Sequence, residues 1–167
     1  MTPRPTESGP VDWIGVLYDR HADALYRYAV MILADSAAAS DAVHQVFLGI
    51  AGKPPGHIRS GESYLRRAVR NECYSALRRR RREMATDNEQ LLETVAAIDE
   101  KPDERLAIEA AIRTLPADQR EVLHLKVFVG LTFQEIADQL HESINTVSSR
   151  YRYAIEKLRQ RLGMTRT

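Results

Sequence analysis

The chain has 167 residues and a formal net charge of +1, and 44% of its residues are apolar and 28% charged, as in an ordinary folded protein. This length accommodates one or two compact domains. No apolar run reaches the length of a membrane span, and one cysteine, Cys73, excludes an internal disulfide and a cysteine-rich metal site. Residues 1–10 lack a secretory apolar segment, so we expect a disordered lead, a cytoplasmic protein and no direct membrane insertion.

Three amphipathic helices are predicted in the first half of the chain. Asp12 is positioned to cap the first helix, whose apolar residues recur every three or four positions. A second helix is predicted over residues 39–50, and a loop rich in Pro and Gly follows it. The third begins after Gly61 and continues into a run of arginines. Together these helices predict a small domain over residues 11–82.

Charge is segregated along the chain although the total is close to zero. Between Arg66 and Arg82 there are eight arginines and one acid, whereas residues 83–109 contain nine acids and two basic residues. The basic block is an electrostatic footprint for phosphates. The acidic block fits two interpretations: a segment that occupies a basic channel or shields the arginines, or a solvated linker. We place this acidic linker at residues 83–102.

The second half of the chain is also predicted to be helical. A short helix is expected at residues 91–98, and Pro102 is placed to open another. Pro116 starts the next helix, with Gly130 as its stop. No alternating strand pattern of useful length occurs. We therefore expect an all-α fold of two small helical domains joined by the acidic linker, the second over residues 103–163.

Residues 131–158 have the pattern of a helix-turn-helix. Thr132 and Glu135 form a capping box at the start of a short helix, and a break at residues 141–143 precedes a longer one. One face of the longer helix is apolar, and the opposite face carries hydroxyl, amide and guanidinium groups, which meet base edges and phosphates in a major groove. A helical hairpin with a solvated polar face fits the capping box alone. The box, the turn and the continuous apolar stripe together favour DNA binding.

Several stretches in order resemble one family, the extracytoplasmic-function sigma factors, which are two-domain sigma subunits of bacterial RNA polymerase. The stretches are Leu17-Tyr18-Asp19-Arg20-His21, Asp41-Ala42-Val43-His44-Gln45-Val46-Phe47-Leu48, Leu115-Pro116 with Gln119-Arg120-Glu121-Val122-Leu123, and Thr132 to Glu135 with Asn145-Thr146-Val147. Several positions depart from the family pattern, among them Ala42, His44, Gln45 and Ser148, and two bear on the sites below. Tyr64 stands where Trp is commoner, and His141 replaces the usual Gly of the turn, where a non-glycine residue adopts an unfavourable backbone geometry.

The resemblance implies three binding surfaces. The second domain would dock its recognition helix on the duplex −35 element through Asn145, Thr146, Ser148, Ser149, Arg150 and Arg152. The first domain would open the −10 element and capture an extruded base, with Tyr64 as the stacking ring and Arg67, Arg70, Asn71 and Arg78 as polar partners. The helix at residues 39–50 would dock on the clamp of core polymerase through Asp41, His44, Gln45 and Phe47.

The function implied is that of a sigma factor, which directs core RNA polymerase to promoter DNA and assists melting of the −10 element. The resemblance also allows an anti-sigma factor as a partner, and it implies no cofactor, no metal and no enzymatic activity. Two other classes stay open. A stand-alone helix-turn-helix regulator would bind a two-fold DNA site without polymerase. An enzyme is disfavoured, because the five histidines show neither metal-ligand spacing nor a Ser-His-Asp arrangement.

Overall fold

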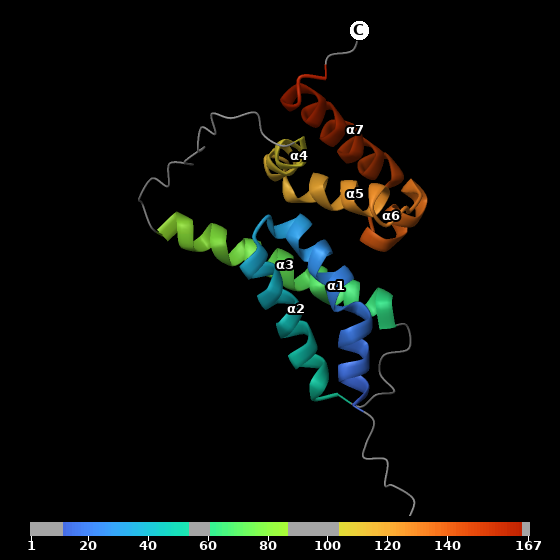
Figure 1. Ribbon diagram of the computed structural model, residues 1–167. Coiled ribbons are helices and arrows are strands. Elements are labelled where there is room, and N and C mark those ends of the chain that lie inside the picture. The colour runs from blue at the N-terminus through green and yellow to red at the C-terminus, as the bar shows by residue number, and fades with distance from the viewer. Residues whose placement is uncertain (1–11, 54–60, 87–103, 165–167) are drawn as a thin grey trace, which may run out of the picture.

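The computed structural model describes residues 12–53, 61–86 and 104–164, and within these ranges every regular element is a helix (Figure 1). The helices are α1 (Trp13–Leu33), α2 (Ser36–Ala51), α3 (Gly61–Thr86), α4 (Glu104–Arg113), α5 (Ala117–Val127), α6 (Phe133–Leu140) and α7 (Ile144–Arg161). This confirms the all-α prediction. The expected lead, the helix at residues 91–98, Pro102 and most of the acidic linker lie outside the described residues.

Helices α1, α2 and α3 pack side by side around one apolar core (Figure 1). Its most deeply buried side chains include Ile32, Leu65 and Val69, each 0% exposed. The Asp12 carboxylate caps α1 by accepting from the Gly15 N–H at 3.0 Å, as predicted.

Helix α2 begins earlier than residue 39, the predicted start. Asp35 has extended backbone geometry, and its carboxylate accepts from the Ala38 N–H at 2.9 Å. This cap allows the helix to begin at Ser36, so the alanines that follow belong to its first turn.

Helix α5 is enclosed on all sides by other helices. Its residues from Arg120 to Leu125 are all buried, although two adjacent members of this run are charged. On one side Leu123 packs with Ala154 of α7, and on the other Val122 and Leu125 join the core of the first three helices. The two halves of the chain therefore share a continuous core, and α5 is the element that joins them.

The end of α5 differs from the prediction. The helix stops at Val127, three residues before Gly130, and the Phe128 and Val129 N–H groups both donate to the His124 carbonyl. Gly130 has a φ of 81° and turns the chain toward α6. The glycine thus shapes the connection and does not itself end the helix.

The helix-turn-helix of α6 and α7 has the predicted local structure. The Thr132 hydroxyl accepts from the Glu135 N–H at 3.2 Å, and the Glu135 carboxylate accepts from the Thr132 N–H at 2.7 Å, which completes the capping box. His141 has a φ of 55° in the turn, and the Ser143 hydroxyl caps α7 by accepting from the Thr146 N–H at 3.0 Å.

Among the described residues, no helix combines the length and the apolar character that crossing a lipid bilayer requires.

Two non-glycine residues, Ala34 and His141, have left-handed backbone geometry, with φ of 53° and 55°. We predict that His141→Gly and Ala34→Gly each raise the free energy of unfolding by about 0.5–1 kcal/mol, because the left-handed region costs a residue with a Cβ roughly 1–2 kcal/mol and the entropy of glycine offsets part of this. Urea denaturation followed by circular dichroism measures the change.

The control for these substitutions is Ala110→Gly, at an exposed position inside α4, which should lower the free energy of unfolding by about 1 kcal/mol. A loss of stability in His141→Gly as large as in the control would contradict the strain assigned to the turn.

Candidate nucleic-acid interface

The face of α7 opposite its apolar stripe is polar and accessible. Asn145 and Arg152 are exposed, whereas Val147 and Ala154 on the other side of the helix are 0% exposed. The hydroxyl-bearing candidates, Thr146, Ser148 and Ser149, are half-buried along the same face. The structure therefore brings five of the six predicted −35 residues to one accessible surface at the N-terminal part of α7.

Arg150, the sixth, is held inside the domain. Its guanidinium pairs with the Asp118 carboxylate of α5 at 3.0 Å and with the Glu142 carboxylate of the turn at 3.2 Å. These bonds fix the start of α7 relative to α5, so Arg150 orients the recognition helix.

The predicted −10 residues form a stripe along α3. Arg67, Asn71 and Arg78 are exposed, and with Tyr64 they recur at spacings that place them along one side of a helix. Tyr64 is half-buried against the core, and its hydroxyl accepts from the Lys53 ammonium at 3.4 Å.

Arg70 lies apart from that stripe. It faces α5, where its guanidinium binds a buried carboxylate, and its side chain is 27% exposed. The structure thus assembles four of the five −10 candidates and turns the fifth toward the other half of the protein.

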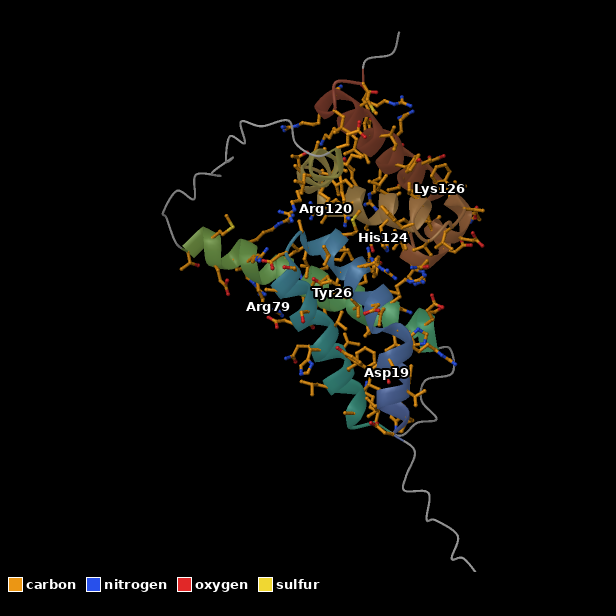
Figure 2. The ribbon with its side chains drawn as sticks, viewed as in Figure 1. Asp19, Tyr26, Arg79, Arg120, His124 and Lys126 are labelled. Atoms are coloured by element: carbon orange, nitrogen blue, oxygen red, sulfur yellow. The ribbon has the colours of Figure 1, made fainter. Side chains whose placement is uncertain are left out.

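The arginine run from Arg78 to Arg82 is exposed on the last turns of α3, which extend beyond α1 and α2 (Figure 1). Arg79, labelled in Figure 2, pairs with Glu72 at 3.1 Å, and Arg80 pairs with Asp35. Within the described ranges, Arg78, Arg81 and Arg82 make no ion pair. In the part of the chain that the structure describes, these three are therefore the members of the run without an acidic partner.

The predicted polymerase-docking residues divide between the surface and the core. Asp41, His44 and Gln45 are exposed on one face of α2, together with Leu48. Phe47 is only 5% exposed and packs edge-on against the Tyr18 ring, with centroids 4.9 Å apart. The Phe47 side chain therefore completes the core and adds little to the exposed face of α2, and its assignment to the docking surface stays a prediction.

Glu121 of α5 is the main polar feature that sequence reasoning missed. Its carboxylate is 1% exposed and accepts from the Tyr28 hydroxyl at 2.5 Å, the Tyr74 hydroxyl at 2.7 Å and the Arg70 guanidinium at 2.6 and 3.3 Å. Burial, followed by the neighbouring Glu121 charge, raises the pKa of both tyrosines above the usual value. Both rings therefore stay protonated and donate to the carboxylate.

Arg120, next to Glu121, binds the end of α1. Its guanidinium donates to the Met31 carbonyl at 2.6 Å, to the Ile32 carbonyl at 2.5 Å and to the Leu115 carbonyl; Figure 2 shows Arg120 between α5 and the α1 end. The last carbonyls of a helix lack partners within it, so Arg120 satisfies two of them. The sequence signal for this site is weak, because the adjacent charges Arg120 and Glu121 lie in a helix that also carries Asp118, Gln119, His124 and Lys126.

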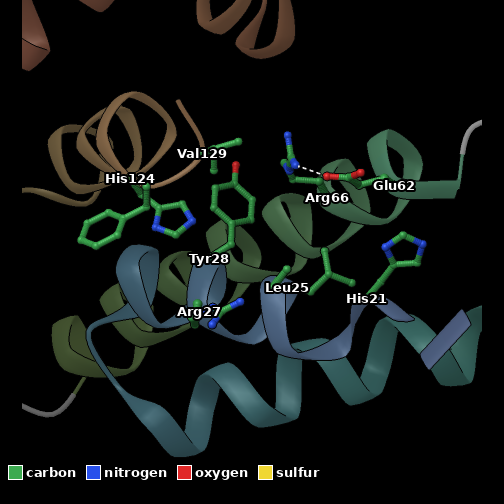
Figure 3. Close-up of a pocket in the computed structure, with 10 residues that line it drawn as sticks. His21, Leu25, Arg27, Tyr28, Glu62, Arg66, His124 and Val129 are labelled. Atoms are coloured by element: carbon green, nitrogen blue, oxygen red, sulfur yellow. Dashed lines mark hydrogen bonds and ion pairs between the residues drawn. The ribbon is translucent and has the colours of Figure 1, made fainter. Parts of the chain in front are cut away.

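A cavity of about 460 Å³ lies between α1, α3 and the end of α5 (Figure 3). It is lined by Arg27 and by Arg66, which pairs with Glu62 at 2.5 Å, and His124 forms part of its wall. Burial, with the nearby arginines, lowers the pKa of His124 to about 4, so the ring is neutral near pH 7. Over the ranges that the structure describes, no three His, Cys, Asp or Glu side chains gather in a way that could hold a metal ion.

Comparison with known proteins gives two family matches and close relatives. Residues 17–83 match Sigma-70 region 2, and residues 105–158 match Sigma-70, region 4. The chain is 32% identical over 163 residues to the ECF RNA polymerase sigma factor SigL of Mycobacterium tuberculosis (strain Erdman), covering 90% of each. It is 28% identical over 166 residues to the ECF RNA polymerase sigma factor SigK of Mycobacterium sp. (strain KMS), covering 93% of this chain and 86% of that protein.

The fold is similar to that of the sigma factor RpoE from Bartonella quintana, solved in complex with the anti-sigma factor NepR. The TM-score is 0.70 at 23% identity, covering 93% of this chain and 100% of that one.

Two helical units with regions 2 and 4 of the sigma-70 type and a helix-turn-helix define a transcription-initiation protein. The chain belongs to the ECF RNA polymerase sigma factors. Its function is accordingly that of a sigma factor, which directs core RNA polymerase to promoters. The matches confirm the resemblance seen in the sequence, and none of them favours a stand-alone regulator. Sigma factors are in general not enzymes.

Arg150 and Arg152 should respond differently to truncation. We predict that Arg150→Ala lowers the free energy of unfolding by about 1 kcal/mol, because it removes a half-buried guanidinium shared by two carboxylates. Arg152→Ala, at an exposed position, should stay within about 0.5 kcal/mol of the wild type. Urea denaturation measures both, and equal stabilities would contradict the orienting role of Arg150.

Proposed function

We propose that this sigma factor engages promoter DNA through two separate surfaces, the polar face of α7 on the duplex −35 element and the exposed stripe of α3 on the −10 element. The observation that carries the proposal is that both helices bury an apolar side and expose base- and phosphate-binding groups on the other. The two surfaces belong to domains that we place at residues 11–82 and 103–163, joined by the acidic linker at residues 83–102, which would occupy the RNA channel of polymerase.

On α7, Asn145 and Arg152 are the principal proposed contacts, since they are the most accessible. An amide and a guanidinium each bind base edges in the major groove with paired hydrogen bonds, and the guanidinium also binds phosphates. The hydroxyls of Thr146, Ser148 and Ser149 add shorter contacts along the same face. Arg150 acts by positioning α7, and its ion pairs support this role over a direct base contact.

On α3, the Tyr64 ring is the proposed platform for an extruded base, and the exposed residues of the stripe supply the polar partners. Base stacking on an aromatic ring contributes about 1–3 kcal/mol per base. Arg67, Asn71 and Arg78 are accessible for this purpose, whereas Arg70 joins them only when it leaves Glu121.

We further propose that α2 docks on core polymerase through Asp41, His44 and Gln45, with Leu48 as an apolar contact beside them. All the proposed contacts are noncovalent, so the bond chemistry stays with the core enzyme. The protein acts in the cytoplasm, where polymerase and chromosome meet. An anti-sigma factor is a further proposed partner.

The core-docking assignment has a direct test. The wild-type protein should co-elute with bacterial core RNA polymerase in gel filtration, and the Asp41→Ala/His44→Ala/Gln45→Ala variant should bind core at least about tenfold more weakly, or roughly 1.4 kcal/mol. The control is Glu109→Ala, at an exposed position on α4. Absence of co-elution by the wild type would overturn the proposed function, and unchanged binding by the triple variant would remove only the α2 surface.

The arginine run should contribute to the salt dependence of DNA binding. We predict that Arg78→Ala/Arg81→Ala/Arg82→Ala flattens the slope of log affinity against log salt by up to about 2–3, because each phosphate contact contributes about 0.7–0.9. Fluorescence anisotropy with the holoenzyme and a promoter fragment measures the slope. Replacing Arg105 and Arg113, both exposed on α4, is the matched control, and an equal change in the two variants would show a general charge effect.

A further inference from the structure

All hydrogen bonds to the buried Glu121 carboxylate cross from one half of the protein to the other. Glu121 lies on α5 of the second domain, and its donors are Tyr28 of α1 with Arg70 and Tyr74 of α3. A carboxylate that is 1% exposed needs such partners, because an unpaired buried charge is costly. The contact is therefore a built interface, in which donors of the first domain satisfy the buried Glu121 carboxylate of the second.

We propose that Glu121, bound by Arg70, Tyr28 and Tyr74, is an intramolecular latch that holds the second domain against α3, beside the proposed −10 surface, and must release before this sigma factor can bind a promoter. This inference rests on the proposed function of α3.

Arg120 provides a second attachment in the same interface. Its guanidinium is 7% exposed and donates to the Met31 and Ile32 carbonyls at the end of α1. The adjacent residues Arg120 and Glu121 thus hold two different helices of the first domain, which fixes the orientation of α5 as well as its position.

The closed arrangement places the helix-turn-helix against the proposed −10 residues. The Arg66 guanidinium donates to the Gln139 amide oxygen of α6 at 3.2 Å. A narrow cavity beside this bond is lined on one side by Arg67, Arg70 and Asn71 and on the other by residues 139–141. Arg67 and Asn71 therefore lie beside the second domain although both remain exposed, and Arg70 is already bound to Glu121.

The distance between the promoter elements requires the latch to open. The −35 and −10 elements are about 25 base pairs apart, which is about 85 Å of B-DNA at 3.4 Å per base pair. In this structure α6 packs against α7 and contacts α3 at Arg66. The stripe from Tyr64 to Arg78 on α3 is only about 21 Å long. One molecule in the closed form cannot reach both elements at once.

When only the open form binds a partner, the apparent affinity for that partner falls in proportion to the fraction of molecules that are open. Core polymerase, which must hold the two domains apart on the promoter, is the partner that would shift this equilibrium. Weakening the latch should therefore strengthen core binding while leaving the docking surface on α2 untouched.

The first experiment compares the full-length wild type with Glu121→Gln, which keeps the side-chain shape and removes the charge. Small-angle X-ray scattering should show a radius of gyration at least about a fifth larger in the variant. Two separated domains have a larger radius of gyration than one compact body with the same number of residues. Apparent affinity for core polymerase should tighten several-fold. The matched control is Glu109→Gln, whose carboxylate pairs with Arg105 on the exposed side of α4, and neither value should change there.

An unchanged radius of gyration in a folded Glu121→Gln would overturn the latch. This scattering test uses no polymerase, so its result is independent of whether the wild type co-elutes with core. Circular dichroism establishes that the variant is folded.

A second experiment decides the question if Glu121→Gln does not fold. Arg66→Cys/Gln139→Cys places two thiols at the interdomain hydrogen bond, where a short bismaleimide reagent joins them. Cys73 does not interfere, because it is 0% exposed and burial raises the pKa of its thiol to about 12.

The cross-linked protein should lose transcription initiation with core polymerase. The reference is the same variant before cross-linking. The control is each single substitution, Arg66→Cys or Gln139→Cys, treated with the reagent. Undiminished initiation by the cross-linked protein would overturn the latch.

Discussion

The buried Glu121 carboxylate is the interaction on which the position of the second half of the chain against the first depends. Moving a carboxylate out of water costs several kcal/mol, and here four hydrogen bonds, three of them 2.5–2.7 Å long, offset that cost. Removing one partner of such a pair typically costs about 3–5 kcal/mol, because the other charge stays buried and uncompensated. Since these donors come from α1 and α3, α5 has one favourable position against them, and α6 and α7 follow α5 through their own apolar contacts.

The interface combines apolar side chains, such as Val122 and Leu125, with the polar network of Glu121, which matters for a protein whose two domains we propose to act on separate DNA elements. The apolar part exposes its area to water when the domains separate. Arg70, Glu121 and the two tyrosine hydroxyls instead regain hydrogen bonds to water, so opening costs less than the number of contacts implies. The same groups require close geometry when closed, which makes the closed form specific in orientation. Buried charge therefore gives an interface that is well defined and still reversible.

Local patterns in the sequence predicted the local structure well. The predictions failed for contacts between residues far apart in the sequence and for the exact ends of helices. The Thr132 capping box, the left-handed His141 and the apolar faces were readable because each involves residues at most a few positions apart. Glu121 could not be assigned, because its partners lie 47 to 93 positions away in the sequence and helical periodicity carries no information on such pairs. The burial of Phe47 was not foreseen, because a family motif marks a segment without saying which of its side chains points inward.

The closed form treats the two proposed DNA surfaces differently. Asn145 and Arg152 of α7 are exposed. Arg67 and Asn71 of α3 are also exposed but border the cavity beside the helix-turn-helix, and Arg70 is bound to Glu121. The proposed duplex contacts of α7 thus need no opening, whereas a −10 contact by Arg70 does. Arg70 is both a latch residue and a −10 candidate, and its guanidinium cannot bind Glu121 and DNA at the same time. Opening of the latch and capture of DNA are therefore linked through one side chain.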